Sequence, residues 1–136
     1  MKVGWIGLGI MGAPMAGHLR AAGHELFVNT RSAVPKALQD AGAIACASPA
    51  EVTKRSEVIF TMVPDTPDVQ KVLFGDNGIA SALTKGKTVI DMSSISPIET
   101  KAFAQKINAL GCDYLDAPVS GGEVGAKAAS LTIMVG

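Results

Sequence analysis

Three glycines lie close together near the start of the chain, directly after a short apolar segment. They are Gly7, Gly9 and Gly12 in GWIGLGIMGAPM. At this spacing, between a strand and a helix, glycines permit a tight turn, let a phosphate group approach the backbone, and let the helix pack closely on the strand. The free N–H groups of a helix start attract anions. The pattern predicts a dinucleotide pyrophosphate site, and the alternative is a turn with a purely structural role. The residues expected to line the site are Gly7, Leu8, Gly9, Ile10, Met11 and Gly12.

The second group of candidate residues lies where the next strand is expected to end. An acidic residue at this position would bind the adenosine ribose and repel a 2′-phosphate, but the segment reads Asn29, Thr30, Arg31. A guanidinium beside hydroxyl groups suits a phosphate dianion. The segment therefore favours NADP over NAD. NAD is still an open alternative because Asn29 or Thr30 could bond a ribose hydroxyl, and Arg31 could instead be a solvated loop residue.

These residues require a fold that brings strand ends together, and the apolar pattern predicts one. The alternation of strands with helices indicates right-handed crossovers and a mostly parallel sheet. We expect an α/β fold, a Rossmann-type doubly wound sheet with helices on both faces, forming a single NAD(P)-binding domain over residues 1–136. Ser96 and Glu99 match a capping box for the last long helix. Strands are expected at 2–6, 25–29, 43–46, 57–62, 88–92, 113–117 and 131–135, and helices at 10–22, 33–40, 48–55, 66–74 and 97–110.

Four segments in this order resemble the β-hydroxyacid dehydrogenase family. They read GWIGLGIMGAPMAGHL, TMVPDTPDV, VIDMSSISPIETK and YLDAPVSGG, and the resemblance extends over the whole chain. It implies an NAD(P)-dependent oxidoreductase that acts on a small-molecule hydroxyacid or the corresponding semialdehyde. It also implies a homo-oligomer for the full-length protein.

The resemblance assigns two further segments to the cofactor. Met62, Val63 and Pro64 would line the path from the adenosine to the nicotinamide, although a plain turn is the alternative. Ser94 would lie beside the nicotinamide ribose, unless it only begins the following helix. Both segments follow expected strands and so belong to the edge of the sheet where ligands bind.

The resemblance also implies a substrate site at Ser120, Gly121 and Gly122, which would bind the substrate carboxylate through a hydroxyl and backbone amides. Small residues after a strand can expose such donors, although a structural glycine turn is the alternative. The family's catalytic lysine belongs to a second, all-helical domain beyond Gly136, and Lys127 does not match its motif. We therefore expect no catalytic residue in this chain. A stand-alone nucleotide-binding module without catalysis is the alternative.

Composition excludes several other classes of protein. The formal net charge is zero and no basic cluster occurs, so no nucleic-acid or anionic membrane partner is expected. Cys46 and Cys112 lack metal-ligand spacing and are interpreted as buried thiols, with no metal site. The first strand begins at once and no apolar segment is long enough to span a membrane, which indicates a soluble, cytoplasmic protein. His18, where the family usually has Asn, is interpreted as a partly buried helix residue, and an apolar strip near 131–135 is expected to be exposed.

Overall fold

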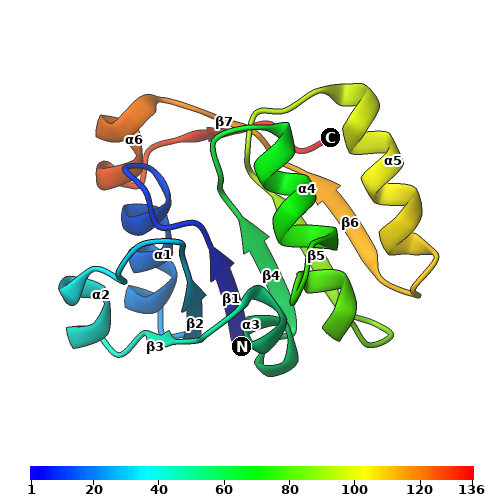
Figure 1. The fold of residues 1–136 in the computed structure, drawn as a ribbon. Helices are drawn as coiled ribbons and strands as arrows, with labels where there is room; N and C mark the ends of the chain where they lie inside the picture. Colours follow the sequence, from blue (N-terminus) through cyan, green and yellow to red (C-terminus); the bar gives the residue numbers. More distant parts are fainter.

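Six parallel strands form the central sheet of the computed structural model, which describes residues 1–136. Their spatial order is β3-β2-β1-β4-β5-β6, so the chain builds outward from β1 in one direction and then in the other (Figure 1). The point of reversal lies between β1 and β4, where a crevice opens at the carboxyl ends of the strands. The strands are β1 (Lys2–Ile6), β2 (Glu25–Asn29), β3 (Ile44–Ala45), β4 (Val58–Thr61), β5 (Thr88–Asp91) and β6 (Asp113–Asp116).

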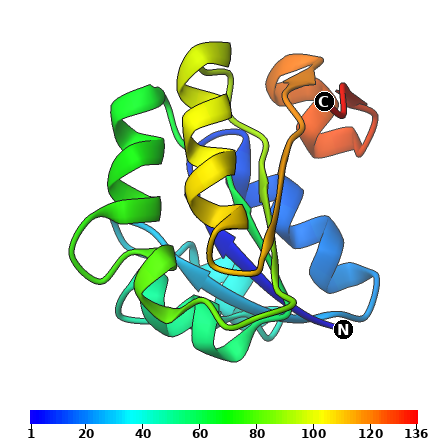
Figure 2. The same cartoon turned by 90° about the vertical axis from the view of Figure 1, so that its right-hand side faces the viewer.

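Helices cover both faces of this sheet, as Figure 2 shows from the side. One buried cluster joins α3, α4, the 3₁₀ helix η1 and α5 to one face, and a second joins α1, α2 and α6 to the other. Neighbouring strand residues alternate between the two clusters, as Trp5 and Ile6 do. The helices are α1 (Gly12–Ala21), α2 (Lys36–Asp40), α3 (Pro49–Arg55), α4 (Thr66–Phe74), η1 (Ile79–Ala82), α5 (Pro97–Asn108) and α6 (Gly122–Ala128). The predicted α/β Rossmann-type fold, with helices on both faces, is confirmed.

The last apolar segment does not join the parallel sheet, contrary to the expected strand over 131–135. Only Thr132–Ile133 (β8) is extended, and it pairs antiparallel with Val119–Ser120 (β7) in a separate two-stranded sheet. Ala129 ends α6 in the left-handed conformation, with φ 56°, and turns the chain back beside β7. The side chains of Ile133, Met134 and Val135 are exposed, as the sequence predicted for this strip.

The short elements η1, β7 and α6 were not expected from the sequence, and the other differences concern the ends of helices and strands. The first helix begins at Gly12 rather than at residue 10. The second begins only after Pro35. The proline ring clashes with the backbone of the preceding residue, Val34, and so keeps that residue out of helical backbone angles. The side chain of Ser96 makes no cap hydrogen bond, and its backbone N–H donates to Thr66 Oγ1 at 3.3 Å, so this N–H is not available to Glu99. The capping box lies instead at the start of α4.

The predictions about the two cysteines and about membrane-spanning segments agree with the structure. Cys46 and Cys112 are free, buried thiols. No helix combines the length and the apolar character that a membrane span needs.

Candidate functional site

A cavity of about 660 Å³ lies at the carboxyl ends of β1, β2 and β4. The structure brings to it every residue that the sequence assigned to a cofactor, from four separate segments of the chain. These residues are Gly7, Leu8, Gly9, Ile10, Met11, Gly12, Asn29, Thr30, Arg31, Met62, Val63, Pro64 and Ser94.

Two of the three glycines are required by close packing of the backbone. Gly7 has φ +101°, and a Cβ there would lie 2.1 Å from the Met62 carbonyl oxygen. A Cβ at Gly12 would lie 1.9 Å from the Gly7 carbonyl oxygen. That oxygen also accepts a hydrogen bond of 2.9 Å from the indole N–H of the buried Trp5. The turn is therefore held in one shape by β1, β4 and α1 together.

Gly9 serves a different purpose, because a Cβ at this position would meet nothing within 4 Å. The backbone N–H groups of Gly9, Ile10, Met11 and Gly12 donate to no acceptor within the chain. They stand at the start of the ten-residue helix α1 and line the cavity. Unpaired amides, the positive end of a helix dipole and space for close approach fit the pyrophosphate of a dinucleotide.

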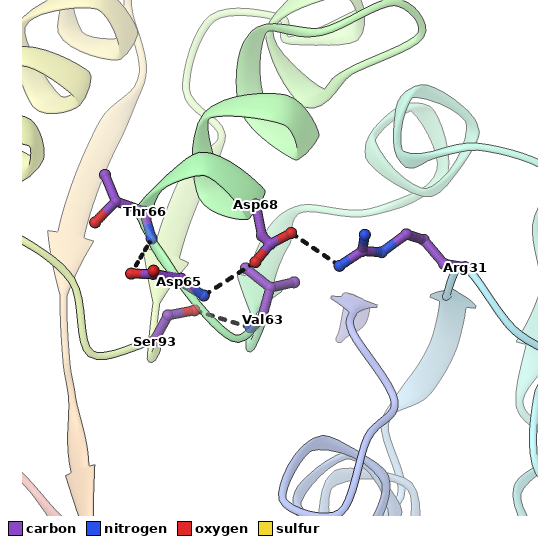
Figure 3. A network of polar contacts seen from close by, with 6 residues as sticks. All are labelled: Arg31, Val63, Asp65, Thr66, Asp68 and Ser93. Carbon is purple, nitrogen blue, oxygen red and sulfur yellow. Dashed lines mark hydrogen bonds and ion pairs between the residues drawn. The ribbon is translucent and has the colours of Figure 1, made fainter.

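The predicted adenosine end of the cavity already contains several hydrogen bonds. The side-chain amide of Asn29 donates to the Cys46 carbonyl at 3.0 Å, and Thr30 Oγ1 accepts the Leu8 N–H at 3.5 Å. Arg31 Nη2 lies 2.8 Å from Asp68 Oδ1, so the guanidinium reaches from the bend after β2 to α4 (Figure 3). The strand end itself has no carboxylate, as the sequence shows, but α4 supplies one.

Sequence reasoning missed the contribution of α4 to this cavity. Asp68, Lys71 and Val72 line it, and their spacing of three and four residues places them on one face of a helix. That periodicity, combined with the expected strand order, was the signal that could have found them. Ile6, Ser32, Pro49 and Asp76 complete the part of the lining that was not predicted.

A buried carboxylate organises the opposite wall. Asp91 at the end of β5 is fully buried, and its Oδ1 accepts the Thr61 hydroxyl at 2.8 Å and the Ser93 N–H at 3.1 Å. Burial raises the pKa of Asp91, and these hydrogen bonds partly oppose that shift. Ser93 Oγ in turn accepts the Val63 N–H at 2.9 Å. No role was predicted for Asp91, although a carboxylate within an apolar strand is a signal that the sequence shows.

The predicted substrate segment lies outside the cavity lining, at the end of β7 and the start of α6. Ser120, Gly121 and Gly122 are exposed, and the backbone N–H groups of the two glycines donate to no acceptor in the chain. Lys127 forms an ion pair with Glu123 at 2.8 Å and does not line the cavity.

α6 is connected to the rest of the site by a side chain of α1. His18 Nε2 lies 2.7 Å from the Ala126 carbonyl oxygen, to which only a protonated ring nitrogen can donate. His18 is half-buried, as predicted. It therefore connects the helix that follows the glycine turn to the helix that follows Ser120.

A parallel sheet of this order, with a glycine turn and unpaired amides at the point of reversal, defines a Rossmann-type nucleotide-binding domain. Comparison with known families gives the particular family. Residues 2–136 match the family described as the NAD binding domain of 6-phosphogluconate dehydrogenase, and the chain belongs to that family.

Relatives and solved structures agree with this assignment. The chain is 60% identical over its whole length to 2-hydroxy-3-oxopropionate reductase of Escherichia coli, of which it covers 47%. It is 40% identical over 135 residues to human mitochondrial 3-hydroxyisobutyrate dehydrogenase, covering 98% of this chain and 40% of that protein. A solved structure described as Psf3 in complex with NADP+ and 2-OPP superposes with a TM-score of 0.91 at 32% identity, covering 98% of this chain and 48% of that one. The chain thus spans about half the length of these relatives.

Proposed function

We propose that these residues form the cofactor domain of an NAD(P)-dependent oxidoreductase of the β-hydroxyacid class. The observation that carries this proposal is the row of unpaired backbone amides from Gly9 to Gly12 at the edge of a cavity large enough for a nucleotide. The substrate we propose is 2-hydroxy-3-oxopropionate (tartronate semialdehyde), reduced to D-glycerate. The 60% identity to the E. coli reductase supports this choice, and so does the resemblance of VPDTP, LFGDNG and DMSSISPIETK to that member of the family.

Each part of the cavity has a separate role in this proposal. The amides of Gly9 to Gly12 bind the pyrophosphate, Arg31 and Thr30 face the adenosine ribose, and Ser94 bonds the nicotinamide ribose. The wall of Met62, Val63 and Pro64 excludes water from the path between them. The nicotinamide supplies the hydride that reduces the substrate carbonyl carbon. Arg31 favours NADP, and NAD is the alternative because a neutral ribose also fits beside Thr30.

Substrate binding is assigned to the segment after β7. The hydroxyl of Ser120 and the unpaired amides of Gly121 and Gly122 would hold the substrate carboxylate and so orient the carbonyl carbon. The proton for the forming alkoxide requires an acid near that carbon, and Lys127, on the helix that begins at Gly122, is already paired with Glu123. The resemblance to the β-hydroxyacid dehydrogenase family implies that a lysine of an all-helical domain outside these residues supplies this proton. Relatives about twice as long support that assignment.

Oxidation of 3-hydroxyisobutyrate is the second candidate activity. The 40% identity to the human dehydrogenase of that name favours it, and the two candidate activities use the same cofactor domain. They are distinguished in the complete protein by comparing kcat/KM for oxidation of D-glycerate with kcat/KM for oxidation of 3-hydroxyisobutyrate. A preference for 3-hydroxyisobutyrate would reject the first proposal in favour of the second.

The cofactor site itself is tested in the 136-residue chain by calorimetric titration with NADH and NADPH. In Gly9→Ala the added methyl group would stand in the open space proposed for the pyrophosphate, and overpacking of about 1–3 kcal/mol predicts about five- to 150-fold weaker binding. Gly17→Ala is the matched control, because its Cβ would make ordinary contact with Leu38, 3.7 Å away. Equal affinities of the two variants would refute the site.

A further inference from the structure

The carboxylate of Asp68 is held by two donors at once. Its Oδ1 lies 2.8 Å from Arg31 Nη2, and its Oδ2 accepts the Asp65 N–H at 3.2 Å. Asp65 caps α4 in turn, because its own carboxylate accepts the Thr66 N–H at 2.8 Å (Figure 3). The capping box therefore fixes the carboxylate of Asp68 in an orientation in which its other oxygen faces Arg31.

The ion pair of Arg31 and Asp68 joins two sides of the cavity. Arg31 follows β2 and Asp68 belongs to α4, which follows β4, and these two strands flank β1. Both side chains line the cavity, with 72% of the Arg31 side chain and 24% of the Asp68 side chain exposed. The pair thus occupies the end of the cavity assigned to the adenosine ribose.

A nucleotide with a 2′-phosphate conflicts with this pair. The phosphate needs the guanidinium of Arg31, which is the cation expected to receive it, but Asp68 already holds that group. A neutral 2′-hydroxyl causes no such difficulty, because it does not need to displace Arg31 from Asp68.

We propose that Asp68 determines cofactor specificity by holding Arg31. It disfavours nucleotides with a 2′-phosphate and shifts the preference that Arg31 alone would give toward NAD. The inference rests on the proposed function, since it requires a dinucleotide in this cavity.

The test uses two small probes that report only on the adenosine end, adenosine 2′,5′-bisphosphate and 5′-AMP. They are titrated calorimetrically at low ionic strength into the parent chain, Asp68→Asn and Asp76→Asn. Asp68→Asn keeps an oxygen acceptor for the Asp65 N–H, and should tighten the bisphosphate relative to 5′-AMP by about fivefold. Asp76→Asn removes the same charge from the same cavity but makes no ion pair, and should change the ratio by less than about twofold.

The same titrations in an Arg31→Ala background separate the mechanism from simple repulsion. If Asp68 acts by holding Arg31, Asp68→Asn should then change the ratio by about twofold or less. An undiminished effect in that background would overturn the inference, and so would an unchanged ratio in Asp68→Asn itself.

Two further outcomes are distinguishable. Failure of every variant to bind either probe would reject the proposed dinucleotide site, whereas binding with an unchanged ratio rejects only the role of Asp68. Should Asp68→Asn not fold, Asp68→Gln provides the same test, because glutamine at the third helical position also completes a capping box.

Discussion

The hydroxyl oxygen of Ser93 accepts the backbone N–H of Val63 at 2.9 Å and thereby ties the end of β5 to the loop after β4. The neighbouring Ser94 is exposed and lines the cavity. Two adjacent serines therefore have different surroundings, one inside the protein and one at the cavity.

Ser93→Ala should lower the free energy of unfolding by about 1–2 kcal/mol, because it leaves the Val63 N–H without a partner in a partly buried position. Ser94→Ala should stay within about 0.5 kcal/mol of the parent chain but bind NADH more weakly. Urea denaturation measures the free energy of unfolding, and calorimetry measures the affinity for NADH. Equal stabilities of the two variants would contradict the separation of roles.

Asp91 makes stability depend on pH in an unusual direction for a carboxylate. Its pKa is raised in the folded chain, so the folded state binds more protons than the unfolded state above the ordinary carboxyl range. The contribution of Asp91 to stability is therefore fully present below the unfolded pKa and is lost as pH rises through the folded pKa.

Asp91→Asn removes this titration while keeping an oxygen acceptor for Thr61 and for the Ser93 N–H. Relative to the parent chain, the variant should gain stability as pH rises from the acid range toward neutrality. Urea denaturation of both proteins at a series of pH values measures the difference. A constant difference across the series would show that the buried carboxylate does not carry this dependence.

The sheet and the glycine turn were predictable because their signals are local. Apolar strands, glycines and helix stops fall within short windows of sequence, and both the fold and the cavity residues around Gly7 to Gly12 follow from them. Ser96 was misinterpreted because its N–H bonds to Thr66, on a different helix. The contact of Arg31 with Asp68 likewise depends on how the fold places the bend after β2 beside the start of α4, which no short segment encodes.

The structure at the end of the chain also depends on contacts between segments that are distant in sequence. The segment 131–135 has the composition of a buried strand, but β6 and β7 are followed by the short helix α6 and a reversal at Ala129. Pairing with β7 then takes precedence over the parallel sheet. The side chains of Ile133, Met134 and Val135 therefore lie outside the core of the main sheet and are exposed.

His18→Leu should loosen α6 without disturbing α1. The substitution removes the donor to the Ala126 carbonyl but keeps a side chain of similar size, so the cost should be about 1 kcal/mol. Amide hydrogen exchange should accelerate over 122–129, since this is the helix the bond holds. His24→Leu is the control because the His24 ring makes no hydrogen bond within the chain. Unchanged exchange in α6 would show that His18 does not anchor it.

The isolated 136-residue chain should bind NADH or NADPH but reduce no detectable 2-hydroxy-3-oxopropionate. Its glycine turn, Arg31 and Ser94 surround one cavity, so most contacts with a dinucleotide can form. Lys127 follows the substrate segment on α6, but its ammonium group is paired with Glu123, so we do not expect it to serve as the catalytic acid. A positioned acid contributes about 10²–10⁴ in rate, and orientation of the substrate contributes more. Calorimetry and an absorbance assay on the same sample measure both properties. Turnover that disappears in Lys127→Ala would instead make Lys127 the acid and place the catalytic residue inside this chain.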